Sequence, residues 1–336
     1  MGYGLLQLFL LRWHTMMSEP KSTNRQHSLT GNEMSQARHH GYLLFGRLLL
    51  EGLTPELLPF VQQVPELATA VPKFYDDDIA AAHYQTIFGF NLFPFQSIFL
   101  DGTGLVGGKE TKRVQKFFMK VGYEGVADVD ADHMGQLLLC MAALCEADIK
   151  KAAQLQAELL SQHLLRWLLP FTCALKLQKR DFYIALANLL QAFVADHACD
   201  LSQALEGQRP FTLPQPPDIL SNKKNGWKEI VAFLLTPVAT GIYLGRDNIG
   251  DLAKQFKLPR GFGEREQMFV NLFQSAIVYD GFSDVMTELK QVTAVYQAHY
   301  AENQPHFPHD AVLASQWQTR TVQTIEFLTR LQTLVA

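Results

Sequence analysis

The spacing of the apolar residues constrains this chain more than any other feature, because nearly every long segment repeats them with the period of an α-helix. Tyr42, Phe45, Leu48 and Leu49 form the first such stripe, which ends near Gly52. Half-buried strands would instead require apolar and polar residues to alternate, and no segment shows that pattern convincingly. The sequence therefore predicts an all-α protein.

Capping residues and turn signals place further helices along the chain. Thr54-Pro55-Glu56 opens a short helix, and the three acids Asp76-Asp77-Asp78 stand where a helix N-terminus favours negative charge. Residues 90–104 are expected to form an irregular, aromatic-rich connector. Later helices are expected at about 110–121, 130–147, 150–168, 180–204, 227–235, 246–256 and 264–300, with a last one carrying Leu313, Trp317 and Leu331.

The composition changes sharply between residues 206 and 226, where proline, glycine and asparagine gather. Such a stretch is typical of a linker. We therefore expect a flexible N-terminal segment (1–35), a helical core (36–205), a linker (206–226) and a C-terminal helical part packed on the core (227–336). Translation is expected to start at Met1, Met16 or Met17.

Charge and cysteine content exclude several classes of protein. The formal charge is −4, from 29 basic and 33 acidic residues, which argues against a general nucleic-acid binder. Cys140, Cys145, Cys173 and Cys199 form no CxxC pair and have apolar neighbours, so buried reduced thiols are expected. The apolar run 2–11 lacks a preceding basic region and is shorter than the roughly 20 residues that span a bilayer. We expect a cytoplasmic protein without stable membrane insertion.

The motifs of common enzyme classes do not occur. The glycines at 102–108 follow no strand, as a dinucleotide site would require, and Gly108-Lys109-Glu110-Thr111 departs from a phosphate-binding loop. His306 and His309 lie three apart, but no acid or cysteine set completes a metal site. We therefore expect no catalytic residues, no cofactor and no metal.

Two stretches are unusual for a plain helical bundle. The connector Pro94-Phe95-Gln96-Ser97-Ile98-Phe99-Leu100 is aromatic where bundles usually have polar loops; it is either a loop tucked against the core or part of an apolar peptide groove. Asp128, Asp130 and Asp132 precede His133 at a helix start. These acids either cap the helix or form a site for an arginine-bearing partner.

A third stretch, His163-Leu164-Leu165-Arg166-Trp167, brings His163 and Trp167 onto one face of a helix. The simpler interpretation is a core histidine beside a core tryptophan, and the alternative is a place in a binding site. His133 and His163 lie on neighbouring helices, and their spacing does not decide whether both reach one site.

The order of these three motifs resembles the TorD/DmsD/NarJ family of maturation chaperones for molybdenum-containing redox enzymes. The resemblance covers about residues 38–200, and the stretch from Thr236 to Pro259 is similar to the C-terminal part of longer members. Family members often carry Glu-Pro before the Asp-His pair, where this chain has Val129-Asp130-Ala131, and an acid four residues after the histidine, where it has Leu137.

The resemblance implies a TorD-like helical bundle with a C-terminal helical extension, and a chaperone rather than an enzyme. The partner it implies is a molybdopterin oxidoreductase subunit, bound in its apo form or through its twin-arginine signal peptide during cofactor insertion and before export. A monomer or a helix-swapped homodimer is compatible with it. The residues expected to line or shape the peptide site are Phe95, Ser97, Asp128, Asp130, Asp132, His133, His163 and Trp167.

Two other functions remain open at this point: a generic helical adaptor between proteins, and a helical regulator that binds a small molecule. A regulator would normally carry a basic DNA-reading helix-turn-helix. The pair Lys223-Lys224 in the linker is not such a motif.

Overall fold

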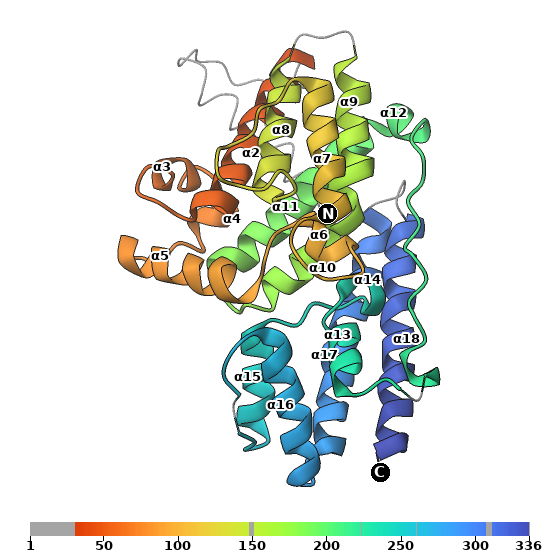
Figure 1. Ribbon diagram of the computed structural model, residues 1–336. Helices are drawn as coiled ribbons and strands as arrows, with labels where there is room; N and C mark the ends of the chain where they lie inside the picture. The colour runs from red at the N-terminus through yellow and green to blue at the C-terminus, as the bar shows by residue number, and fades with distance from the viewer. Residues whose placement is uncertain (1–30, 148–150, 223, 260, 307–310, 336) are drawn as a thin grey trace. The chain divides into compact units, whose positions relative to one another are not determined.

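The computed structural model describes residues 31–147, 151–222, 224–259, 261–306 and 311–335, and every regular element in these ranges is a helix (Figure 1). The prediction of an all-α protein is therefore confirmed. The chain forms two compact units. Unit 1 comprises the described residues of Met1–Gln85, Thr111–Leu165 and Leu175–Pro210, and unit 2 comprises those of Thr86–Glu110, Arg166–Ala174 and Phe211–Ala336. The boundaries expected from the sequence stay a prediction.

Most helices of the first half of the chain belong to unit 1. These are α2 (Gly31–Glu51), α3 (Leu58–Val61), α4 (Pro65–Ala68), α5 (Asp77–Tyr84), most of α7 (Gly108–Val121), α8 (Met134–Glu146), α9 (Ala152–Leu159), the π-helix η2 (Leu160–Leu164), α11 (Asp181–Asp200) and α12 (Ser202–Glu206).

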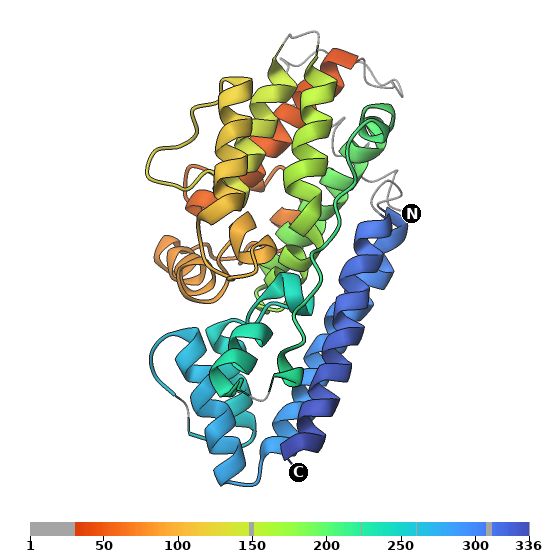
Figure 2. The ribbon, with the colours of Figure 1, turned by 45° about the vertical axis from the view of Figure 1, so that its right-hand side comes forward.

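Unit 2 contains the remaining helices. These are most of the π-helix η1 (Gln85–Asn91), α6 (Gln96–Leu100), most of α10 (Leu165–Lys176), the 3₁₀ turn η3 (Ile219–Ser221), α13 (Trp227–Leu234), α14 (Pro237–Thr240), α15 (Arg246–Gln255), α16 (Arg265–Val278), α17 (Phe282–Asn303), the 3₁₀ turn η4 (Gln304–His306) and α18 (Ala311–Val335). The long helices α17 and α18 lie side by side, as both ribbon views show (Figure 2).

Two glycines let helices α2 and α8 approach closely in unit 1. A Cβ atom added at Gly135 would lie 2.5 Å from Leu50 Cγ and 2.8 Å from the carbonyl oxygen of Gly46. A Cβ added at Gly46 would lie 2.8 Å from Leu139 Cδ2. A side chain at either position would force neighbouring atoms to shift, so the backbones of α2 and α8 lie close together at these two glycines.

Helix α11 is joined to α2 by polar contacts as well as by its apolar face. The buried guanidinium of Arg38 forms ion pairs with Asp196, at 2.7 Å, and with Asp200. The hydroxyl of Tyr42 lies 2.8 Å from Nδ1 of His197. Removing one member of such a buried pair leaves an uncompensated charge, so these contacts fix how the two helices align.

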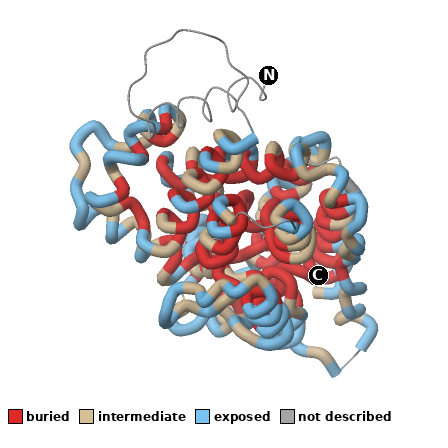
Figure 3. The backbone as a smooth tube through the Cα atoms, turned by 90° about the horizontal axis from the view of Figure 1, so that it is seen from above, coloured by how far each residue is buried: buried red, intermediate tan, exposed pale blue. Residues whose placement is uncertain are grey.

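Helix α11 is also long and apolar enough to cross a membrane by length and composition alone. In the protein, 67 % of its apolar window is buried. Figure 3 shows how buried and exposed residues are distributed along the helices.

The helix expected over 150–168 continues further, through η2 and α10 to Lys176, although Pro170 lies inside it. Proline has no N–H, so the carbonyl oxygen four residues earlier loses its helical donor. That carbonyl belongs to Arg166, and the indole Nε1–H of Trp317 donates to it at 3.0 Å. The helix therefore passes through the proline because a side chain from α18 replaces the missing bond.

The single helix expected over 264–300 is divided into α16 and α17. Asp280 adopts a left-handed φ of 57°, and the N–H of Gly281 donates to the carbonyl oxygen of Ala276 at 2.7 Å. This arrangement is a turn that ends a helix. The pair Asp280-Gly281 is a turn signal in the sequence, but the prediction gave more weight to the continuous apolar periodicity.

Two further expectations are corrected at the level of local structure. The connector 90–104 is not irregular throughout, because Gln96–Leu100 form helix α6. Residues 31–35, assigned to the flexible N-terminal segment, belong to helix α2. The run 2–11, the three candidate start residues Met1, Met16 and Met17, and the residues Lys223 and His309 lie outside the described ranges.

Candidate functional site

The aromatic connector in unit 2 is held in place by its serine. Ser97 is fully buried, and its hydroxyl oxygen accepts a 3.1 Å hydrogen bond from the backbone N–H of Gly107. Phe95, at the start of α6, is half-buried. The loop that Ser97 fastens presents Leu105, which is 67 % exposed, and Val106 to solvent. The connector therefore combines a buried anchor with an exposed apolar tip.

Trp167 lies in the core of unit 2. Its ring is 5.1 Å from that of Phe99, which in turn stacks on Tyr243 at 5.4 Å. The side chain of Trp167 is fully buried, and its indole Nε1–H has no hydrogen-bond partner among the described residues. Trp167 can thus shape a site only through the packing of Phe99 and its neighbours.

The acidic stretch before α8 divides into buried and exposed carboxylates in unit 1. Asp132 is fully buried, and its Oδ1 accepts a 2.8 Å hydrogen bond from the hydroxyl of Thr111. Asp128 and Asp130 are exposed. Gln136 holds the backbone of their loop through two hydrogen bonds to Val126. Its amide oxygen accepts from the N–H of Val126 at 2.9 Å, and its amide nitrogen donates to the carbonyl oxygen of Val126 at 2.8 Å.

The N-cap of α8 is His133 and none of the three acids. Its Nδ1 accepts a 3.0 Å hydrogen bond from the backbone N–H of Gly135. Burial lowers the pKa of His133 from 6.5 to about 4, so the ring is neutral near pH 7 and Nδ1 is available as an acceptor. The interpretation that the acids cap this helix is corrected accordingly.

His163 is buried in the π-helical turn η2 of unit 1. Its ring lies 5.4 Å from that of Phe117 on α7. Of the eight residues predicted to form the peptide site, five are buried, Phe95 is half-buried, and only Asp128 and Asp130 are exposed. Three of the eight lie in unit 2, namely Phe95, Ser97 and Trp167, and the other five lie in unit 1. A shared peptide-binding role for them stays a prediction.

The sequence reasoning did not single out a pocket of about 530 Å³ in unit 1. Its rim carries two large apolar side chains, Phe74 and Ile79, which are 84 % and 54 % exposed. Large exposed apolar groups beside a concave surface are typical of binding sites. The pocket is lined by Leu53, Thr69, Ala70, Val71, Pro72, Phe74, Tyr75, Asp76, Ile79, Ala80, His83, Lys179, Arg180, Asp181, Phe182 and Tyr183.

Carboxylates and a neutral histidine surround the apolar part of this pocket. Asp76 caps α5 by accepting from the N–H of Ile79 at 3.0 Å. The hydroxyl of Tyr75 lies 3.0 Å from Asp77 Oδ1, and burial together with this carboxylate raises the tyrosine pKa to about 12. Burial and the charge of Arg180 lower the pKa of His83. A signal for the pocket was present in the sequence, since Phe74 and Ile79 flank the three acids.

Comparison with known proteins finds a similarity for about a third of the chain. Residues 58–173 match the family model described as nitrate reductase delta subunit. The matched range includes the pocket wall from Thr69 to His83 and all eight predicted site residues. No curated protein matches the chain.

This family consists of redox-enzyme maturation chaperones that act on nitrate reductase-type molybdoenzyme subunits, and it is not a family of catalytic enzymes. The expectation of a chaperone rather than an enzyme is confirmed by this match. Residues 58–173 are therefore similar to the NarJ/TorD-like chaperone family.

Proposed function

We propose that this protein is a cytoplasmic chaperone that binds a molybdopterin oxidoreductase subunit, in its apo form or through its twin-arginine signal peptide, during cofactor insertion and before export. The observation that carries the proposal is the family match over residues 58–173. The binding requires no bond-making chemistry, no nucleic acid and no stable membrane insertion. The protein acts as a monomer or as a helix-swapped homodimer.

The apolar part of the client peptide occupies the unit 1 pocket in this proposal. Phe74 and Ile79 are poorly shielded from water in the unbound protein. Covering them with an apolar peptide segment removes that surface from water, which favours binding by roughly 25 cal/mol for each Å² of apolar surface buried. A volume of about 530 Å³ accommodates a few side chains of such a segment, within the range of about 300–1,000 Å³ that is common for ligand pockets.

Exposed carboxylates receive the paired arginines. Asp128 and Asp130 are exposed on a loop whose backbone Gln136 holds at Val126, so both carboxylates are accessible to a partner. A carboxylate and a guanidinium form charge-assisted hydrogen bonds, often in pairs. Of the other predicted residues, Phe95 is accessible enough for contact, whereas Ser97, Asp132, His133, His163 and Trp167 shape the site from within.

A synthetic signal peptide with two arginines before an apolar run, labelled with a fluorophore, provides the test. Fluorescence anisotropy measures its affinity for the full chain, and the same peptide with both arginines replaced by lysine is the control ligand. We expect the lysine peptide to bind about tenfold more weakly, because lysine lacks the planar fork that pairs with a carboxylate.

Two sets of variants separate the apolar and the charged contacts. The double variant Phe74→Ala/Ile79→Ser is expected to bind both peptides about tenfold or more weakly. The double variant Asp128→Asn/Asp130→Asn is expected to lose affinity mainly for the arginine peptide. Phe262→Ala, at an aromatic residue 88 % exposed in unit 2, and Asp251→Asn, at an exposed acid, are the matched controls. If neither a twin-arginine peptide nor a purified apo subunit binds, the proposal is wrong.

A further inference from the structure

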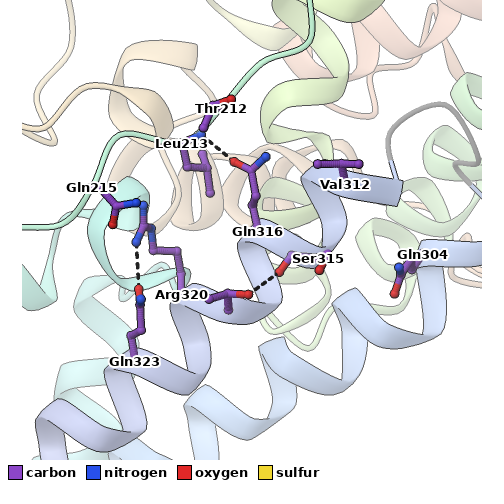
Figure 4. A pocket seen from close by; sticks show the side chains of 10 residues that line it. Thr212, Leu213, Gln215, Gln304, Val312, Ser315, Gln316, Arg320 and Gln323 are labelled. Carbon is purple, nitrogen blue, oxygen red and sulfur yellow. Dashed lines mark hydrogen bonds between the residues drawn. The ribbon is translucent and has the colours of Figure 1, made fainter.

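A second pocket, of about 460 Å³, lies within unit 2 between the segment 212–215 and helix α18 (Figure 4). The proposed chaperone function does not use it. Its walls carry amide and hydroxyl side chains, with two aliphatic residues and a single charged one. They are Thr212, Leu213, Gln215, Gln304, Val312, Ser315, Gln316, Thr319, Arg320 and Gln323.

The charged residue is a buried cation. Arg320 is only 5 % exposed, and its side chain extends from α18 to a position beside Gln215 and Gln323 (Figure 4). One terminal nitrogen, Nη1, donates to Gln323 Oε1 at 2.8 Å, and the other, Nη2, donates to the carbonyl oxygen of Pro214. Nε is buried and has no hydrogen-bond partner among the described residues.

Both of these acceptors are neutral oxygens, so the charge of Arg320 is not balanced. Among the described residues, no carboxylate forms an ion pair with it, and burial lowers the pKa of its guanidinium without an opposing contribution from an acid. Arginine remains protonated in proteins even so. Keeping a guanidinium away from water without a counter-charge is unfavourable, and an anion would relieve that cost.

A purely structural role explains only part of this arrangement. The segment 211–214 is already fastened to α18 by Gln316, whose amide oxygen accepts from the N–H of Leu213 at 2.7 Å and whose amide nitrogen donates to the carbonyl oxygen of Phe211. A neutral donor at position 320 would provide the bond to Pro214 without the cost of a buried charge. The guanidinium also retains one further N–H on each terminal nitrogen beyond these two bonds, which suits an oxyanion.

We propose that this pocket binds a small polar molecule bearing one oxyanion group, a carboxylate or a phosphate, and that Arg320 receives the anion. The amides of Gln215, Gln304 and Gln316 and the hydroxyl of Ser315 hydrogen-bond the uncharged part of the molecule. This site is independent of the client-binding site proposed above, so either proposal can fail alone.

Thermal unfolding of the full chain with defined anions tests the proposal. The probes are inorganic phosphate, glycerol 3-phosphate, acetate and lactate, each against chloride at equal ionic strength. A ligand that binds only the folded protein raises the unfolding midpoint, and we expect a saturable rise of about 2–4 °C with at least one probe. Whether the phosphates or the carboxylates give this rise identifies the oxyanion.

Substitutions show whether the rise comes from Arg320. Arg320→Gln is expected to abolish it, and Arg320→Lys to reduce it, because lysine keeps the charge but lacks the paired donors. Arg330→Gln is the matched control, since Arg330 lies on the same helix but is 60 % exposed and 4.0 Å from Asp218. Its response should equal that of the unmodified protein.

Gln323→Glu keeps the test decisive if Arg320→Gln fails to fold. This change places a carboxylate where the neutral acceptor of Arg320 now lies, 2.8 Å from Nη1. The variant should unfold at the same or a higher temperature without ligand and should lose the anion-dependent rise. If no probe exceeds chloride, or if Gln323→Glu responds like the unmodified protein, the proposal is overturned.

Discussion

The hydroxyl of Thr111 on α7 donates a 2.8 Å hydrogen bond to Oδ1 of Asp132, and both side chains are buried. The contact joins α7 to the residue that precedes the N-cap of α8. Asp132 belongs to the Asp-His motif on which the family resemblance rests. In this protein, the aspartate of that motif thus holds two helices of unit 1 together and is not presented to solvent.

Replacing Thr111 with valine tests this contact. The valine has a similar shape but no hydroxyl, so Asp132 loses a donor while the packing changes little. We expect the free energy of unfolding to fall by about 1–3 kcal/mol, the typical cost of removing one partner from a buried polar group. Urea unfolding measures this value. Thr69→Val, at an exposed threonine, is the control and should change stability by less than about 0.5 kcal/mol.

The buried histidine that caps α8 makes stability depend on pH. Its pKa is lowered from 6.5 to about 4, so above pH 6.5 it is neutral in both folded and unfolded chains and its stabilising contribution is complete. As the pH falls from 6.5 towards 4, the unfolded chain takes up a proton that the folded protein resists. The free energy of unfolding then falls, by on the order of 3 kcal/mol at pH 4 for this group.

His133→Asn isolates that contribution, because asparagine also caps helices well but does not titrate. Urea unfolding at several values between pH 7 and pH 4 should give a shallower decline for the variant. His197, whose pKa is lowered by burial well below 6.5, leaves a residual decline in both proteins. The exposed His306→Asn is the control. Equal slopes for His133→Asn and the unmodified protein would contradict the assignment.

The close approach of α2 and α8 makes Gly135 intolerant of a side chain. An added Cβ would lie 2.8 Å from the Gly46 carbonyl oxygen, a backbone atom that cannot move aside without shifting the helix. We expect Gly135→Ala to destabilise the protein by about 1–3 kcal/mol through overpacking, despite the better helix propensity of alanine. Chemical denaturation measures the loss, with Gly102→Ala as control because a Cβ there has no atom within 4 Å.

Local signals in the sequence account for much of the fold. The apolar stripe of α2, the cap at Asp76 and the helices flanking residues 206–226 depend on neighbouring residues, which periodicity and capping rules describe well. The same rules placed a helix end before Pro170 and missed the break at Asp280. The first error arose because Trp317, distant in sequence, supplies the hydrogen bond that proline cannot. The second arose because a long apolar stripe outweighed a short turn signal.

For the candidate site, the motifs identified the family but not which side chains are accessible. A histidine, an aspartate and a tryptophan look alike in sequence whether they face a ligand or the core. Burial depends on which helices pack against each residue, and the structure buries Asp132, His163 and Trp167. The exposure of Phe74 and Ile79 depends on the same packing, although the three acids between them were visible in the sequence.

The sequence by itself determined that the chain is helical, that it carries the motifs of a chaperone family, and roughly where its helices lie. These properties follow from contacts between residues close together along the chain. Only the tertiary structure decided that Gly135 meets Gly46, that His133 is a neutral cap, and that Arg320 is a buried cation without a carboxylate partner among the described residues. Those properties depend on residues far apart in sequence, whose contacts arise only when the helices pack.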